Sequence, residues 1–161
     1  SQLGKGSTFY FTLRLPPAEE QAAEEFTQPH IDLSGKRILV AEDNALNMDI
    51  VQFFLEDFGC IVTPASDGKQ ALEQFRDSPE GYFDLILMDV MMPIMDGLEA
   101  TNAIRTLPRA DSRTIPIVAL SANAFDEDVK RSLASGMNAH LSKPIESVKL
   151  ADVLSKMLAK Q

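Results

Sequence analysis

Short aliphatic runs alternate with longer helical patterns along most of the chain, beginning near Lys36. Five of these runs are rich in β-branched or aliphatic residues: RILVAE, CIVTPAS, FDLILMD, IPIVALS and MNAHLSK. Segments with the apolar spacing of a helix separate them. Strands that alternate with helices are typical of βα units, so the pattern predicts an α/β domain with five parallel strands, doubly wound, with right-handed crossovers.

Two of the helical segments carry apolar stripes that indicate a face packed on a core. The first is expected to end at Gly59, because glycine readily adopts the backbone conformation that ends a helix. The residues expected in the core are Ile50, Val51, Phe54, Leu55 and Phe58 in the first helix and Leu150, Val153, Leu154, Met157 and Leu158 in the last. Both stripes have the spacing of one helix face.

The first 34 residues have a different composition. Residues 1–15 (SQLGKGSTFYFTLRL) alternate apolar and polar positions after two glycines, which predicts a half-buried strand without a visible partner. Residues 16–34 are bounded by prolines and carry four glutamates with few large apolar groups, as linkers do. The chain therefore divides into an N-terminal strand at 1–15, an acidic linker at 16–34 and one domain at 35–161.

Composition narrows the possible partners. The 161 residues are 45% hydrophobic, enough for a sizeable core, and the net charge is −9. Since the 15 basic residues are scattered among 24 acidic ones, a nucleic-acid partner is not expected. A single cysteine, Cys60, excludes an internal disulfide and is interpreted as a small core residue. No apolar run approaches membrane-spanning length, so we expect a cytoplasmic segment without direct membrane contact, which could belong to a membrane-bound protein.

Polar residues follow four of the five predicted strands. The residues at these positions are Glu42 and Asp43 after the first strand, Asp89 after the third, Ser121 after the fourth and Lys143 after the fifth. In doubly wound sheets, ligands bind outside the carboxyl ends of the strands. These side chains are therefore expected to meet at one edge of the sheet.

Three carboxylates in one crevice predict a metal site. At a separation of about 5 Å, each pair would repel by roughly 3 kcal/mol at an effective dielectric constant near 20. A divalent cation with oxygen ligands relieves this repulsion, and Mg²⁺ fits better than zinc because no His or Cys joins the cluster. From the cluster of Glu42, Asp43 and Asp89 we expect one or two direct carboxylate ligands, with a backbone carbonyl from the loop after Asp89 and waters.

The cluster also has the parts of a phosphoryl-transfer site. The Lys143 ammonium and the Ser121 hydroxyl, with the metal, can hold phosphoryl oxygens around an aspartate nucleophile, Asp89. Each residue has a simpler interpretation when taken alone: the Glu42–Asp43 pair could be loop acids, and Asn44 could itself cap the following helix. Their joint occurrence at four strand ends favours function.

Residues from about Lys36 to Lys160 resemble the receiver domain of two-component response regulators. The motifs that carry the resemblance are the acidic pair, the phosphoacceptor in MDVMMPIMDG, the switch hydroxyl in LSAN and the lysine in SKP. The resemblance implies a flavodoxin-like fold with strand order 2-1-3-4-5, an arrangement for which a member of this family is a standard example. It also implies that Asp89 takes a phosphoryl group from phosphohistidine and loses it slowly by hydrolysis.

The resemblance further implies roles for single residues. Mg²⁺ would be held by Asp43, Asp89 and the Met91 carbonyl, with Glu42 acting through water, and the Lys143–Pro144 bond would be cis. Phosphorylation would move Ser121 and, three residues before the lysine, an aromatic switch side chain. Here that position is His140, which could act as a polar switch or be a partly exposed strand histidine with no such role.

The N-terminal GKGSTFYFTL resembles the last glycine-rich motif and strand of the ATP-binding domain of histidine kinases. A lone GxG is a weak signal, and a glycine-rich segment of no relation is the alternative. With the linker and the receiver-like domain, the segment suggests a hybrid sensor kinase. This chain lacks the kinase active site, because most of that domain is missing and neither His30 nor His140 lies in a phosphorylatable histidine motif.

Expected partners are a histidine kinase core, in the same polypeptide, and a histidine phosphotransfer protein. A dimer through the fourth helix, fifth strand and fifth helix, or through the N-terminal strand, is a further possibility. Two other functions are a phosphatase with an aspartyl nucleophile, although Met91 stands where such enzymes usually place an acid, and a receiver-like binding module that is not phosphorylated.

Overall fold

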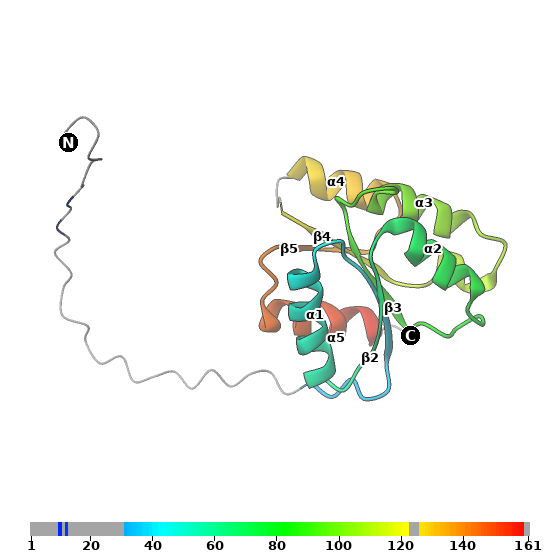
Figure 1. Cartoon of the computed structure of the whole chain (residues 1–161). Helices are drawn as coiled ribbons and strands as arrows, with labels where there is room; N and C mark the ends of the chain where they lie inside the picture. Colours follow the sequence, from blue (N-terminus) through cyan, green and yellow to red (C-terminus); the bar gives the residue numbers. More distant parts are fainter. Residues whose placement is uncertain (1–9, 11, 13–30, 123–125, 160–161) are drawn as a thin grey trace.

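A computed structural model describes residues 10, 12, 31–122 and 126–159 of the chain. Five strands form one parallel sheet in the order β2-β1-β3-β4-β5, as expected for the flavodoxin-like fold (Figure 1). The strands are β1 (Arg37–Ala41), β2 (Ile61–Ala65), β3 (Leu85–Asp89), β4 (Ile117–Ser121) and β5 (Ala139–Ser142). The helices are α1 (Ala45–Asp57), α2 (Gly68–Asp77), α3 (Gly97–Thr106), the short 3₁₀ helix η1 (Ala110–Arg113), α4 (Asp126–Ala134) and α5 (Ser147–Leu158). Of the predicted strand in residues 1–15 only positions 10 and 12 are described, and most of the predicted linker lies outside the described residues.

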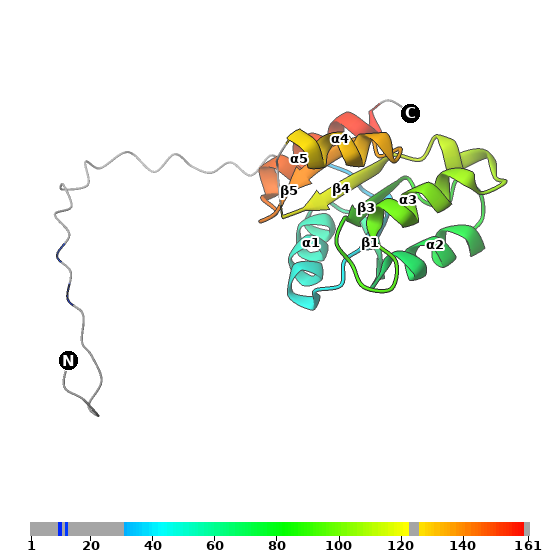
Figure 2. The same cartoon turned by 90° about the horizontal axis from the view of Figure 1, so that it is seen from above.

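The three central strands, β1, β3 and β4, are buried on both faces, which explains their nearly continuous apolar runs. Alternate residues of the central strands enter two separate cores, because successive side chains point to opposite faces of a sheet. Ile38 and Val40 of β1 pack under α1 and α5, whereas Leu39 and Ala41 pack under α2 and α3. Figures 1 and 2 show these two helical layers, with α4 beside β5 and α3.

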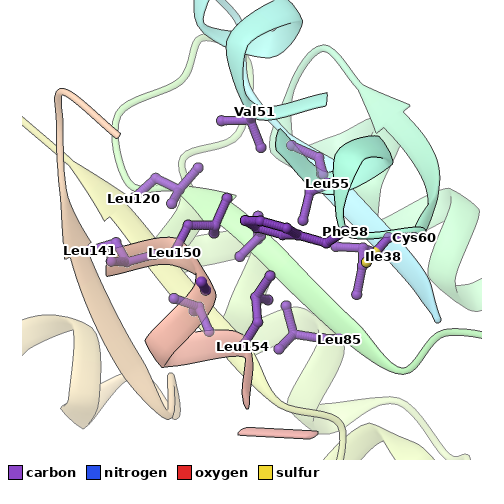
Figure 3. Packing of buried hydrophobic residues seen from close by; sticks show 14 of the residues in the cluster. Ile38, Val51, Leu55, Phe58, Cys60, Leu85, Leu120, Leu141, Leu150 and Leu154 are labelled. Carbon is purple, nitrogen blue, oxygen red and sulfur yellow. The ribbon is translucent and has the colours of Figure 1, made fainter. Parts of the chain in front are cut away.

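Helix α1 departs from its predicted core face. Val51, Leu55 and Phe58 are buried, and Figure 3 shows them beside α5 residues such as Leu150 and Leu154. Ile50 was expected in this core, but it is 39% exposed, so that prediction was wrong. The helix ends as predicted, since Gly59 has φ +83° and its amide donates to the carbonyl of Glu56 at 2.9 Å.

Residues 31–35, mostly assigned to the linker by the sequence, contact the domain. The amide of Leu33 donates to the carbonyl of Phe58 at 2.9 Å, and that of Gly35 donates to Gly59 at 3.0 Å. The Ile31 and Leu33 side chains pack against the α1–α5 core. This segment is therefore attached to the C-terminal end of α1.

Within the part of the chain that the structure describes, no helix combines the length and the apolar composition needed to cross a membrane.

Cys60 lies in the same core, and we predict that it reacts slowly with thiol reagents. Burial, together with the Asp84 charge, raises the pKa of its thiol from 9.0 to about 11. Because only the thiolate reacts, at pH 8 this shift alone lowers the reactive fraction about 100-fold. Labelling by iodoacetamide, followed by mass spectrometry, is expected to be far slower in the native chain than in urea. Equal rates in the two states would contradict the prediction.

Candidate functional site

Parallel pairing places the predicted polar residues at one edge of the sheet. Glu42 and Asp43 follow β1 directly, and Asp89 is the last residue of β3. Ser121 ends β4, and the Lys143 amide, just after β5, donates to the Ser121 carbonyl at 2.8 Å. The carboxyl ends of four strands thus deliver all five side chains to the same region, as the order of the strands requires.

Lys143 is the centre of the charge arrangement. Its Nζ lies 2.6 Å from Asp89 Oδ2, to which it donates a hydrogen bond, and 2.6 Å from Glu42 Oε2. Both carboxylates are buried, whereas the lysine side chain keeps 17% of its exposure. One ammonium group therefore offsets part of the repulsion between two buried acids.

Two further donors orient the carboxylates. The Met91 amide donates to Asp89 Oδ1 at 3.1 Å, and the Asn47 side-chain amide donates to Glu42 Oε1 at 2.9 Å. Asn47 was not identified from the sequence; the available signal was its place in the first turn of the helix after the acidic pair. Asn44 caps this helix by accepting from the amides of Leu46 and Asn47, which fixes the turn that carries Asn47.

Close backbone packing holds the loop that follows Asp89. A Cβ atom at Gly97 would lie 2.1 Å from the Asp89 carbonyl oxygen, so only glycine allows α3 to begin there. Asp96 caps α3 by accepting from the Glu99 amide at 2.8 Å, while the Glu99 side chain accepts from the Asp96 amide. This capping box fixes the end of the loop.

Burial and the nearby charges change the acidity of the site. Burial raises the pKa of Asp89 above its ordinary value, and the hydrogen bond from Lys143 only partly opposes it. Burial would lower the pKa of Lys143, but hydrogen bonds to Asp89 and Glu42 prevail and raise it. Lys143 therefore stays charged at neutral pH, while the ionised form of Asp89 is held at a cost in stability.

Glu42, Asp43 and Asp89 form a cluster that could hold a cation. One carboxylate oxygen from each lies within 4.8 Å of the others, and only Asp43 is exposed. All three donors are hard oxygen ligands, and no His or Cys belongs to the group, so the residues present suit Mg²⁺. The exposed position of Asp43 leaves one side of the cluster open to solvent.

The remaining predicted residues lie close to this edge or just below it. Met91 is exposed in the loop after Asp89, and the Lys143–Pro144 bond is cis. His140 pairs with Ala119 in the interior of β5 and is half-buried. It is therefore the predicted site residue that lies furthest from the strand ends.

Comparison with known proteins identifies the family. Residues 38–155 match the response regulator receiver domain. The chain is 39% identical over 137 residues to hybrid signal transduction histidine kinase I of Dictyostelium discoideum, covering 81% of this chain and 8% of that protein. It is 36% identical over 157 residues to the aerobic respiration control sensor protein ArcB of Escherichia coli K12, covering 97% of this chain and 19% of ArcB. The chain thus spans less than a fifth of the length of either relative.

Solved structures show the same fold. The receiver domain of sensor histidine kinase PA1611 from Pseudomonas aeruginosa PAO1, which has magnesium in its active site cleft, is 36% identical. The TM-score is 0.71, covering 78% of this chain and 99% of that one. The receiver domain of Ssk1 from Saccharomyces cerevisiae, crystallised with the phosphotransfer protein Ypd1, is 28% identical with a TM-score of 0.70, over 80% of this chain and 92% of the matched chain. The chain belongs to the response regulator receiver domain family and is a receiver domain of two-component phosphorelay signalling.

Proposed function

We propose that Asp89 accepts a phosphoryl group from a phosphohistidine and that the phosphorylated domain switches conformation. The observation that carries the proposal is the position of Asp89, buried at the end of β3 with Lys143 Nζ 2.6 Å from its Oδ2. In the transfer, a carboxylate oxygen of Asp89 forms a bond to phosphorus while the P–N bond breaks. The histidine keeps the electron pair and then takes up a proton.

The residues of this chain supply positioning and charge in that reaction. Lys143 is placed to hold a phosphoryl oxygen after it releases the carboxylate, and the Ser121 hydroxyl, at the neighbouring strand end, is placed to bond a second. Glu42, Asp43, Asp89 and the Met91 carbonyl would hold Mg²⁺. When bound, Mg²⁺ would neutralise negative charge on the phosphoryl group.

The conformational response is proposed to begin at Ser121. Movement of its hydroxyl toward the phosphoryl group would shift the chain between β4 and α4 and alter the surface formed by α4, β5 and α5. His140, on β5, would adjust to this movement. The phosphoryl group biases an equilibrium that exists without it.

The parent protein is proposed to be a cytoplasmic hybrid histidine kinase or the cytoplasmic part of a membrane-bound one. Both relatives compared above are histidine kinases or sensor proteins by name, and the ArcB match is longer than residues 38–155. The proposed partners are the kinase core, in the same polypeptide, and a histidine phosphotransfer protein. A dimer through α4, β5 and α5 would place the half-exposed Leu133 and Val148 in contact with a second copy.

Acetyl phosphate with Mg²⁺ tests the proposed chemistry. The expected product is a one-to-one adduct, stable in acid and labile in base, detected by intact mass spectrometry and lost when EDTA replaces Mg²⁺. A phosphatase would instead turn over many phosphate esters, and Met91, two residues after the nucleophile, offers no general acid for that reaction. A binding module would form no adduct. Either of these two results would overturn the proposal.

A further inference from the structure

Met91 is the exposed methionine of this chain. The structure describes all seven methionines, and Met91 is 76% exposed. The other six are buried in the two cores or pack half-buried against them: Met48, Met88, Met92, Met95, Met137 and Met157. Cys60 does not compete for an oxidant, because burial raises the pKa of its thiol to about 11 and keeps it protonated. Among the sulfur-containing side chains, Met91 is therefore the one best placed to react with a peroxide from solvent.

Met91 also lines a cavity beside the proposed phosphoacceptor. The cavity has a volume of about 110 Å³ and lies between the loop after β3, the end of β4 and α4. Ser121 lines the same cavity. The backbone of Met91 is tied to Asp89, because its amide donates to Asp89 Oδ1 at 3.1 Å. The exposed thioether and the hydroxyl proposed to bond the phosphoryl group thus border one small space.

The polar groups around this cavity include several hydrogen-bond donors. Ser121 and Ser132 are buried and each carries a hydroxyl, while Arg131 is an exposed cation on α4. Asp96 also lines the cavity, but as an acceptor, and its side chain already caps α3. A thioether sulfur accepts hydrogen bonds only weakly, so reduced Met91 is an apolar part of the wall.

Oxidation of Met91 would add a strong acceptor to the cavity. The lone pair of the sulfur attacks one oxygen of a peroxide, so that the S–O bond forms as the O–O bond breaks. The other oxygen leaves with the electron pair of that bond, takes up the proton of the transferred oxygen and departs as water or an alcohol. Because the methionine side chain is unbranched and flexible, the sulfoxide oxygen can reach donors in the cavity wall. The backbone carbonyl of Met91, which is proposed to hold Mg²⁺, is unchanged by the reaction.

We propose that Met91 is a site of reversible oxidation by peroxides and that its sulfoxide slows phosphorylation of Asp89 by competing for the Ser121 hydroxyl. This inference rests on the proposed function of Asp89 and adds redox control to it. The Ser121 hydroxyl has one proton to donate, so it cannot serve a sulfoxide and a phosphoryl oxygen together. Arg131 would hold the sulfoxide in the cavity through a charge-assisted hydrogen bond. Methionine sulfoxide reductases would restore the thioether.

Limited treatment with hydrogen peroxide, followed by peptide mass spectrometry, tests the site of oxidation. We expect Met91 to gain oxygen at least about five-fold faster than any other methionine of the native chain. Met88, Met92 and Met95 share its tryptic peptide, so fragment ions are needed to distinguish them. In urea the seven methionines should react at similar rates, because the selectivity comes from the fold. Faster oxidation of another methionine in the native chain would overturn the assignment.

The rate of adduct formation from acetyl phosphate and Mg²⁺, measured before and after oxidation, tests the control. The oxidised wild type is expected to react about five-fold more slowly, as one competing hydrogen bond would require, and to recover after treatment with the reductases. Met91→Leu is compared with itself, and peroxide should leave its rate unchanged. Met92→Leu is the matched control, because it removes the neighbouring half-buried methionine, and it should lose rate on oxidation as the wild type does.

Ser121→Ala tests whether the sulfoxide acts through the hydroxyl. Its rate is expected to be low, but equal in the reduced and oxidised forms, because the group for which the sulfoxide competes is absent. A further loss on oxidation in this variant would overturn the role of Ser121. Equal or higher rates in the oxidised wild type, or a loss that Met91→Leu shares, would overturn the redox control. Failure of the reduced wild type to form an adduct would instead refute the function of Asp89, and the peptide map would still report where the chain is oxidised.

Discussion

Replacing Asp89 with asparagine is expected to abolish the phosphorylated form of the chain. The asparagine side chain would keep the size of the aspartate but would lack the anionic oxygen that attacks phosphorus. The measurement is intact mass spectrometry after incubation with acetyl phosphate and Mg²⁺, in which the adduct should disappear completely.

Asp152→Asn is the control for that experiment. It makes the same chemical change on the exposed surface of α5, where Asp152 pairs with Lys156 at 2.6 Å. This variant should form the adduct like the wild type. A wild-type yield of acid-stable adduct in Asp89→Asn would place the phosphoacceptor elsewhere.

The same substitution is expected to stabilise the metal-free fold at pH 7. The folded state raises the pKa of Asp89 by burying it, so the native chain binds this proton more readily than the unfolded chain does. The contribution of Asp89 to stability is therefore fully present below the ordinary carboxyl pKa. It is lost as the pH rises through the raised pKa that Asp89 has in the folded state. The Asp89→Asn variant should have a higher melting temperature than the wild type in EDTA at pH 7, and the difference should shrink near pH 3. A lower melting temperature at pH 7 would show that the Lys143 pair outweighs burial.

The site was predictable from sequence because parallel strands impose its geometry. Once Asp89, Ser121 and Lys143 are each placed after an apolar run, the common edge of the sheet brings them together without further information. The orienting donor Asn47 was missed because the sequence does not show which polar residue of a first turn faces the acidic pair. The position of Lys143 between Glu42 and Asp89 could not be predicted in this way. It depends on a contact between the residues that follow β1 and β5, and these strands are not neighbours in the sheet.

The position of Ile50 was mispredicted for a different reason. This helix is apolar on more than one side, with Ile50 and Phe53 outside and Val51, Phe54 and Leu55 inside or at the boundary. Periodicity identifies a helix but does not choose between two apolar faces. The choice is made by packing against α5 and the sheet, which a single sequence does not reveal.

A second large effect is expected at Arg109, which belongs to none of the motifs that carry the site. Its guanidinium pairs with Asp111 at 2.6 Å, stacks over Phe75 at 4.2 Å and donates to the carbonyls of Phe75, Arg76, Ser78 and Pro79. The Arg109 and Asp111 side chains are only 8% and 16% exposed. One side chain thus satisfies the carbonyls at the end of α2 and joins them to η1.

Arg109→Ala is expected to lower the free energy of unfolding by about 3–5 kcal/mol at pH 7, because it removes the cationic partner of the largely buried Asp111 and a donor to several carbonyls. Urea unfolding followed by circular dichroism measures the change. The hydrogen bond from Arg109 lowers the pKa of Asp111, so this stabilisation is present above the ordinary carboxyl pKa and is lost as pH falls through the lowered value. The difference in the free energy of unfolding between the wild type and Arg109→Ala should therefore become smaller in acid. Arg76→Ala is the control, because it breaks an exposed ion pair with Asp77, and it should unfold at the wild-type urea midpoint. An equal loss of unfolding free energy in the two variants would show that the network around Arg109 has no special role.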